Sequence, residues 1–220
     1  MIADRDQPNS HSDHYFSAQP ATPAKKKLIE VELNDTPYEL YTAPGVFSPG
    51  HLDTGTKVLL RAVTAPPTGN LLDIGCGWGP IALTMALKNP DAQVWAVDVN
   101  ERSLELTRDN AAKLGLTNIT AVTPDQIPGD IEFAEIWSNP PIRIGKDALH
   151  ELLLQWLPRL APGSSAFMVV QKNLGADTLM KWLNEQFGDS AGGSMTAQTV
   201  RIDTSKGFRV LETIRQDDAD

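Results

Sequence analysis

The sequence predicts an α/β protein with a doubly wound, mostly parallel sheet of seven strands and a β-hairpin in front of it. Five short apolar runs alternate with amphipathic helical segments, which is the pattern of parallel strands joined by crossover helices. Two β-like runs close together in the chain then follow the last helix and favour an antiparallel edge hairpin. The length of 220 residues and the 41% hydrophobic content fit one main globular domain.

The chain ahead of this alternation has three parts. Residues 1–13 are polar and aperiodic, and we expect them to be a disordered tail. Within an N-terminal extension, 14–50, two β-like runs at 28–33 and 38–41 flank a turn and predict the first hairpin. A helix is expected over 52–63.

The main domain is expected to span residues 51–215, with a short acidic tail at 216–220. Its strands are predicted at 71–74, 93–97, 119–122, 133–137, 166–170, 196–202 and 208–214. Four later helices are predicted. They lie at 80–88, between an N-cap at Asn100 and a C-terminal stop at Gly115, along the apolar stripe at 149–160, and at 176–187.

The charge and the cysteine content limit the possible functions. The formal net charge is −9, so the overall field does not draw the protein to phosphate backbones, and a nucleic-acid role requires a local basic face. Cys76 is the only cysteine and the histidines show no ligand spacing, so we expect neither a disulfide nor a bound metal. No apolar run reaches the length of a membrane span or a signal core, which predicts a cytoplasmic protein.

A glycine-rich loop follows the first strand of the sheet, at the end where doubly wound folds bind ligands. Asp73 is followed by Gly75, Gly77 and Gly79, and the dinucleotide motif would need a further glycine where Pro80 stands, so NAD is disfavoured. An acidic residue facing the pocket suits a ligand with an ammonium or sulfonium group. The loop resembles the first motif of class I S-adenosylmethionine methyltransferases; the alternative is a tight turn without a ligand.

Two more loops are expected at the same edge of the sheet. Asp98 ends the second strand, where a carboxylate can accept hydrogen bonds from vicinal ribose hydroxyls, although a solvated aspartate would also fit. The resemblance places Asp125 and Gln126, after the third strand, beside the exocyclic amine of adenine.

Asn139-Pro140-Pro141-Ile142 follows the fourth strand. A nitrogen conjugated to a ring or a carbonyl is a weak nucleophile, so a transferase must hold it in line with the methyl carbon and accept its hydrogens. The Asn139 side-chain oxygen and the Pro140 carbonyl can be those acceptors, and the prolines fix φ and remove competing N–H donors. Asn-Pro-Pro is also a common structural turn.

Together these motifs resemble the methyltransferase small domain family, related to ribosomal RNA guanine-N2 methyltransferases. The similarity also includes the segments 14–17, 45–48, 53–57, 143–146, 171–172 and 206–208. It implies that S-adenosylmethionine is held by Thr56, Asp73, Gly75, Cys76, Gly77, Asp98, Val99, Asp125, Gln126 and Asn139. It implies a catalytic role for Asn139, Pro140, Pro141 and Ile142. Arg143, Lys146 and Lys172 would bind substrate phosphates, or else be solvated surface charges.

The sequence departs from this family in two respects. The larger enzymes carry a degenerate duplicate of the domain, for which 220 residues leave no room, and Ile142 stands where the family usually has an aromatic residue. The expected function is methyl transfer to an exocyclic base amine of ribosomal RNA, with guanine N2 the first candidate. The alternatives are a protein glutamine amide or a small-molecule amine as acceptor, and a non-catalytic partner protein that binds the cofactor. The oligomeric state is left open.

Overall fold

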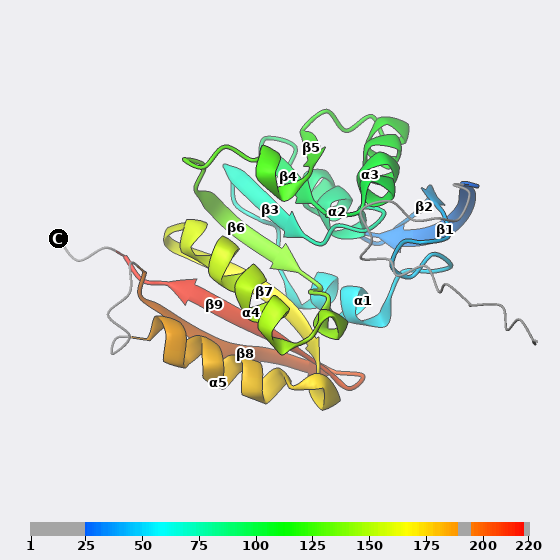
Figure 1. Ribbon diagram of the computed structural model, residues 1–220. Helices are drawn as coiled ribbons and strands as arrows, with labels where there is room; N and C mark the ends of the chain where they lie inside the picture. The colour runs from blue at the N-terminus through cyan, green and yellow to red at the C-terminus, as the bar shows by residue number, and fades with distance from the viewer. Residues whose placement is uncertain (1–24, 189–194, 218–220) are drawn as a thin grey trace, which may run out of the picture.

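The computed structural model describes residues 25–188 and 195–217. The expected disordered tail, 1–13, and the matching segment 14–17 lie outside the described residues, as does the end of the acidic tail. The structure has one sheet of seven strands in the order β5-β4-β3-β6-β7-β9-β8 and a separate two-stranded hairpin (Figure 1). The first five strands in that order are parallel, and β9 is antiparallel to both of its neighbours, as expected for a doubly wound sheet with an antiparallel edge.

The elements follow the predicted order. The hairpin strands are β1 (Lys27–Leu33) and β2 (Thr36–Thr42). The strands of the large sheet are β3 (Asn70–Ile74), β4 (Gln93–Val97), β5 (Ile119–Val122), β6 (Phe133–Ser138), β7 (Leu160–Gln171), β8 (Ala197–Ser205) and β9 (Phe208–Arg215). The helices are α1 (Thr54–Ala62), α2 (Pro80–Lys88), α3 (Glu101–Lys113), α4 (Lys146–Trp156) and α5 (Ala176–Phe187).

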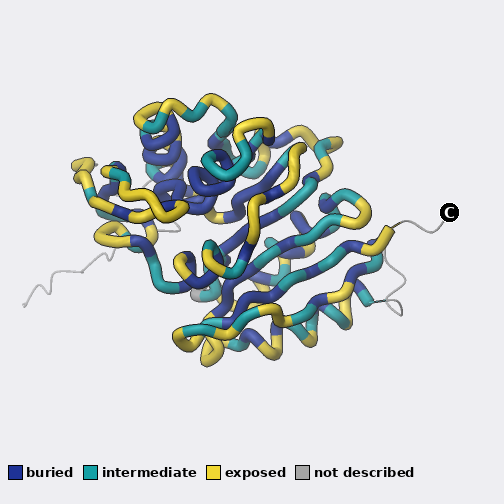
Figure 2. The backbone as a smooth tube through the Cα atoms, turned by 180° about the vertical axis from the view of Figure 1, so that it is seen from behind, coloured by how far each residue is buried: buried dark blue, intermediate teal, exposed yellow. Residues whose placement is uncertain are grey.

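Alternate residues of the central strands bury the two faces of the sheet. In β3, Leu72 and Ile74 pack with α4 and α5, whereas Leu71 packs with α1, α2 and α3 on the opposite face (Figure 1). The central strands are therefore buried along most of their length, and exposed residues gather on the turns and the outer faces of the helices (Figure 2). Burial on both faces explains why these strands are continuous apolar runs in the sequence.

The hairpin packs against α2 and α3 through a core of its own, in which Leu33, Leu40 and Trp78 are buried. Asn110 of α3, fully buried, fixes this contact because its side chain accepts a hydrogen bond from the Tyr41 N–H and donates to the carbonyls of Tyr41 and Trp78. Asn110 thus ties the hairpin directly to the glycine loop, of which Trp78 is a part.

The bounds of one helix and one strand differ most from the prediction. The helix expected over 149–160 spans Lys146–Trp156, and it ends there because Pro158 has no N–H with which to continue the helical hydrogen bonds; a short 3-10 turn, Leu157–Arg159, follows. The strand expected at 166–170 begins earlier, at Leu160. Its pairing with β6 shifts register after Phe133, with Gly163 at φ 72° in the extra segment.

Three 3-10 turns lie at the carboxyl ends of strands, close to the predicted loops. They are η1 (Pro124–Gln126), η2 (Ile142–Ile144) and η4 (Lys172–Leu174). The strand order reverses between β3 and β6, which makes the carboxyl ends of these two strands the switch point where such sheets bind ligands. No helix in the described ranges is long and apolar enough to cross a membrane.

Candidate functional site

A cavity of about 660 Å³ opens at this switch point. Its lining includes the ends of β3, β4 and β6, the segment Val46 to Pro49, one side of α4, and Phe208 at the start of β9. The volume lies within the range of small-molecule and cofactor sites. The glycine loop, the loop at Asp98 and the Asn-Pro-Pro loop therefore all line one cavity.

The glycine loop lies directly against the Asn-Pro-Pro loop. A Cβ added to Gly75 would lie 3.9 Å from Cδ of Pro141, and the Ser138 hydroxyl donates to the Ile74 carbonyl at 2.8 Å. Gly75 and Gly77 have φ of 75° and 57°, a region that glycine adopts readily, and a Cβ on Gly77 would have no atom within 4 Å. The missing side chain at Gly77 leaves open space for a ligand beside the backbone.

Asp98 lines this cavity and holds the glycine loop in place. Its Oδ2 accepts the Gly77 N–H at 3.0 Å, and its Oδ1 accepts the Asn100 N–H at 2.9 Å. Burial raises the pKa of Asp98, although these hydrogen bonds act in the opposite direction. The Ser103 side chain and the Val99 N–H also donate to this carboxylate, which lies at the edge of the cavity that a ligand would enter.

Asp73 does not face the cavity, in contrast to the expectation from the sequence. The side chain is fully buried beneath the loop, where Oδ2 accepts the Ala82 N–H at 3.0 Å and Oδ1 has no hydrogen-bond partner within residues 25–188 and 195–217. Burial raises the pKa of Asp73 to about 8. The alternation of a strand explains this placement, because Asp73 points away from the face on which Ile74 and Leu72 lie.

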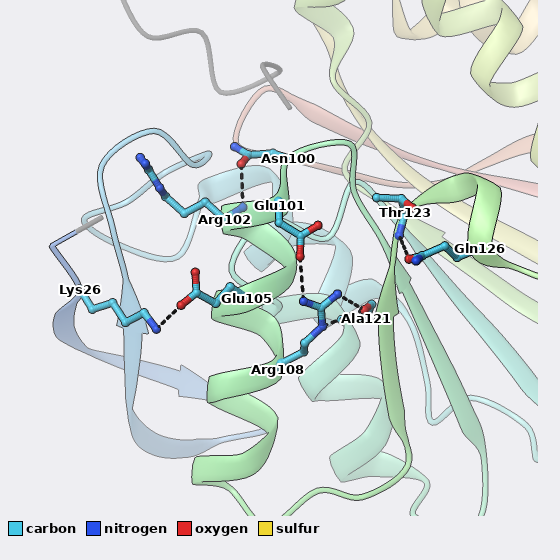
Figure 3. Close-up of polar contacts among 9 residues, drawn as sticks. All are labelled: Lys26, Asn100, Glu101, Arg102, Glu105, Arg108, Ala121, Thr123 and Gln126. Atoms are coloured by element: carbon cyan, nitrogen blue, oxygen red, sulfur yellow. Dashed lines mark hydrogen bonds and ion pairs between the residues drawn. The ribbon is translucent and has the colours of Figure 1, made fainter. Parts of the chain in front are cut away.

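The other residues expected around the cofactor divide into two groups. Val99 lines the cavity and is half exposed. Cys76 is buried in the core among the helices that cover the sheet, and only its neighbours Gly75 and Gly77 line the cavity. Asp125 and Gln126 are exposed and do not line the cavity; the Gln126 side chain instead accepts the Thr123 N–H at 3.1 Å (Figure 3).

Asn139 follows β6 and is held by two residues near the start of α1. Its Nδ2 donates to Asp53 Oδ2 and to Thr56 Oγ1, each at 3.0 Å. A carboxylate oxygen can only accept, so the nitrogen of the amide must face Asp53, and the carbonyl oxygen faces away from it. Among the described residues this oxygen, Oδ1, has no hydrogen-bond partner, and it remains available to a donor in the cavity that Asn139 lines.

The remaining residues of the loop line the same cavity. Pro140, Pro141 and Ile142 all contribute, and the Pro140 carbonyl accepts the Ile142 N–H at 2.8 Å. A carbonyl oxygen has two lone pairs, so this bond leaves Pro140 able to accept one more hydrogen. The loop thus lines the cavity next to the glycine loop, with Pro140 already accepting one hydrogen within the loop.

The expected basic residues are only partly gathered. Lys146 and Lys172 are exposed at the starts of α4 and η4, after neighbouring strands of the sheet, and the side chain of Arg143 lies outside the described part of the structure. Lys26 forms an ion pair with α3, in which its ammonium lies 2.7 Å from the Glu105 carboxylate (Figure 3). It therefore does not extend a basic face.

Sequence reasoning did not assign a role to several residues that line the cavity. The most important of them is Asp53, because it contacts Asn139 directly. Its position before Gly55 and Thr56 is that of a helix N-cap, and this role alone accounts for an aspartate there, so the sequence did not indicate the contact with Asn139. Further lining residues are Phe47, Glu151, Gln155 and Phe208. The matching segments 45–48, 53–57 and 206–208 were the available signal for three of these positions.

The fold and this site define a class I methyltransferase, with a glycine loop after the first parallel strand and an Asn-Pro-Pro loop across the switch point. Comparisons with known proteins agree with this class. A model of the methyltransferase small domain matches residues 37–200, so the chain belongs to the methyltransferase small domain family. The expected enzyme class, an S-adenosylmethionine-dependent methyltransferase, is thereby confirmed.

Individual relatives are consistent with this family. The chain is 33% identical over 182 residues to YbxB, an uncharacterised protein of Bacillus subtilis, covering 81% of this chain and 90% of that protein. It is 32% identical over 192 residues to ribosomal RNA small subunit methyltransferase C of Pseudomonas putida, covering 85% of this chain and 54% of the relative. The chain therefore spans about half the length of the ribosomal RNA methyltransferases that it matches.

A solved structure supports the fold. A 16S rRNA N2 methyltransferase of T. thermophilus, in complex with AdoMet and guanosine, matches with a TM-score of 0.74 at 22% identity. The match covers 90% of this chain and 52% of that chain. At this identity the likeness concerns the fold alone.

Proposed function

We propose that this protein transfers a methyl group from S-adenosylmethionine to an exocyclic amine of a base in ribosomal RNA, and that guanine N2 is the acceptor. The observation that carries the proposal is the orientation of the Asn139 amide. Its nitrogen is held by Asp53 and Thr56, so its oxygen is left as an acceptor in the same cavity as Gly75 and Gly77.

The two acceptor oxygens suit a planar amine. The lone pair of an exocyclic amine is delocalised into the ring, and it becomes nucleophilic as the nitrogen turns tetrahedral. Asn139 Oδ1 and the Pro140 carbonyl would accept the two N–H groups, align the lone pair and favour that geometry. After transfer the nitrogen is positively charged and loses a proton, so the chemistry needs no strong base in the site.

The residues around the glycine loop fit the cofactor. When bound, S-adenosylmethionine supplies a methyl carbon attached to a positively charged sulfur. The open space beside Gly77 admits a ligand against the backbone, and Asp98 can accept hydrogen bonds from ribose hydroxyls. Asp98 lines the cavity, and a carboxylate there favours a cationic donor.

The choice of RNA rests on the names of the relatives and on local charge. Several relatives are named ribosomal RNA small subunit methyltransferase C, and the solved T. thermophilus enzyme is described as an N2 methyltransferase with guanosine bound. Lys146 and Lys172 are exposed beside the cavity on an otherwise acidic chain, where they could contact phosphates.

Substitution of Asn139 tests this function. Purified wild type should transfer labelled methyl groups from S-adenosylmethionine to ribosomal RNA or small subunits from a strain that lacks this protein, and mapping of the label should find N2-methylguanine. Asn139→Ala should lower kcat about 100-fold or more, because it removes one acceptor from the reacting nitrogen. Its Kd for S-adenosylhomocysteine, measured by calorimetry, should change less than about threefold.

Three outcomes would contradict the proposal. Label in protein or small-molecule fractions, with none in RNA, would favour a glutamine amide or a free amine as the acceptor. Loss of cofactor binding in Asn139→Ala would show that Asn139 binds the cofactor and not the acceptor amine. Absence of transfer to every acceptor, with cofactor bound, would favour a non-catalytic partner protein.

A further inference from the structure

Asp53 connects two parts of the site that are 86 residues apart in the chain. Its Oδ2 caps helix α1 by accepting the N–H groups of Gly55 at 2.7 Å and Thr56 at 3.2 Å. The same oxygen accepts the Asn139 Nδ2–H at 3.0 Å. The first two bonds belong to an ordinary helix cap, but the third reaches across to the acceptor loop after β6.

The third bond removes an ambiguity that an asparagine side chain otherwise has. The two ends of the amide have nearly the same shape, and only their hydrogen-bond partners decide which end is oxygen. Thr56 Oγ1 also accepts from Asn139, but a hydroxyl can equally donate, so Thr56 alone would tolerate the amide turned either way. Asp53 tolerates only one orientation.

We infer that Asp53 is a positioning residue that holds the Asn139 amide with its oxygen toward the acceptor nitrogen. The inference rests on the proposed function for its kinetic consequence, since Asn139 must contact the amine for its orientation to affect transfer. The negative charge of Asp53 would also polarise the amide and strengthen its oxygen as an acceptor. Asp53 itself need not touch the reacting atoms.

The packing around Asp53 maintains this contact. A Cβ on Gly55 would lie 2.9 Å from Asp53 Oδ2 and 2.9 Å from the ring of Phe208, so any larger residue at position 55 would push on both. Thr56 is 3% exposed, which keeps water from competing at this end of the amide. The absence of a side chain on Gly55 thus lets the carboxylate and the phenyl ring approach α1 together.

A double-mutant cycle tests the inference. Methyl transfer is measured for wild type, Asp53→Ala, Asn139→Ala and the double variant, with enough substrate to separate kcat from KM. Asp53→Ala should lower kcat about ten- to hundredfold, as expected for a lost hydrogen bond to a charged group, and change KM for S-adenosylmethionine less than about threefold. In the Asn139→Ala background the same change should lower kcat less than about twofold.

Two further variants separate positioning from helix stability. Asp53→Asn keeps an oxygen for the cap and for Asn139, so its kcat should stay within about tenfold of wild type and above that of Asp53→Ala. Val58→Ala is the matched control: it truncates a buried residue of α1 without touching Asp53 or Asn139. Its kcat should match wild type well below its melting temperature.

An NMR measurement on the protein without substrate tests the inference whatever the acceptor is. The side-chain amide of Asn139, assigned in a 15N–1H spectrum by its absence from Asn139→Ala, should have slowly exchanging protons in wild type. In Asp53→Ala its signals should shift and its exchange should quicken. An unchanged Asn139 amide would overturn the inference, and so would kinetic effects of Asp53→Ala and Asn139→Ala that simply multiply. Absence of transfer by wild type would reject the proposed function, and the amide spectrum would still decide the role of Asp53.

Discussion

Asp73 and Asp98 lie near the carboxyl ends of neighbouring parallel strands, yet only Asp98 lines the cavity. Asp98 is past the end of β4 and shares its hydrogen bonds with the loop, whereas Asp73 lies within β3 with its side chain enclosed. A buried carboxyl group without a second hydrogen-bond partner is more stable protonated than charged. In this structure Asp73 holds the start of α2 through Ala82 and does not line the cavity.

The pH dependence of stability should report this difference. The pKa of Asp73 is about 8 in the folded protein and about 3.9 in an unfolded chain, so the folded state binds the proton more tightly. Its contribution to the free energy of unfolding is then full below about pH 4 and declines as the pH rises to about 8. Asp73→Asn should remove that decline, so its stability relative to wild type should be greater at pH 8.5 than at pH 5.

Urea unfolding of both proteins at several pH values measures this effect, with the exposed Asp35→Asn as the control. A constant difference between Asp73→Asn and wild type across this range would show that Asp73 is charged in the folded state.

At the scale of elements, the joint between the glycine loop and α2 depends on one residue. Gly79 caps α2 with φ 96°, and a Cβ there would lie 3.0 Å from Thr107 Oγ1 on α3. The same Thr107 hydroxyl donates to the Gly77 carbonyl at 3.1 Å. The loop, α2 and α3 therefore meet at a point where only glycine fits both the backbone and the space.

Gly79→Ala should destabilise the protein by roughly 1–2 kcal/mol from backbone strain alone, and should weaken cofactor binding because Thr107 must move away from the loop. Gly129→Ala is the matched control, since a Cβ there would meet no atom within 4 Å and its φ is not in the left-handed region. Urea unfolding and S-adenosylhomocysteine calorimetry measure both effects. Equal behaviour of the two variants would mean that the loop relaxes freely.

At the scale of the whole molecule, the N-terminal hairpin is joined to the domain by a polar side chain within an apolar interface. Asn110 makes three hydrogen bonds to the backbone of Tyr41 and Trp78, and the ion pair of Lys26 with α3 lies at the exposed edge of the same contact (Figure 3). Buried and exposed polar contacts differ in energy, because only the buried groups lose water when they are left unpaired. The hairpin also leads into the Val46 to Pro49 segment that lines the cavity.

Asn110→Ala should lower the free energy of unfolding by about 1–3 kcal/mol, because it leaves buried backbone groups without partners. Hydrogen exchange of the β1 and β2 amides should quicken more than that of the central strands. Asp109→Ala, which removes only an exposed partner of Lys26, should change stability by less than about 1 kcal/mol. Uniformly faster exchange across the protein would contradict a local role for Asn110.

The order of strands and helices followed from the sequence, because a parallel strand that is buried on both faces is a continuous apolar run and the helices between the strands are amphipathic. Asn100 and Gly115 bound α3 as their types predict. Pro158 is a signal for the end of a helix, but the apolar periodicity of α4 continues beyond it to Leu160. The helix was therefore predicted to be longer at this end than it is. Periodicity reports which residues are buried and does not by itself report where a helix stops.

The sequence by itself determined the family, the α/β order of elements and the loops that would meet at one edge, since all of these depend on local composition and spacing. Only the tertiary structure decided which side chains enter the cavity. It placed Asp73 below the loop and brought Asp53 to Asn139, which is 86 residues away in the chain. Contacts between residues far apart in sequence depend on how strands and helices pack. Local composition and spacing do not reveal which of these residues will lie close together.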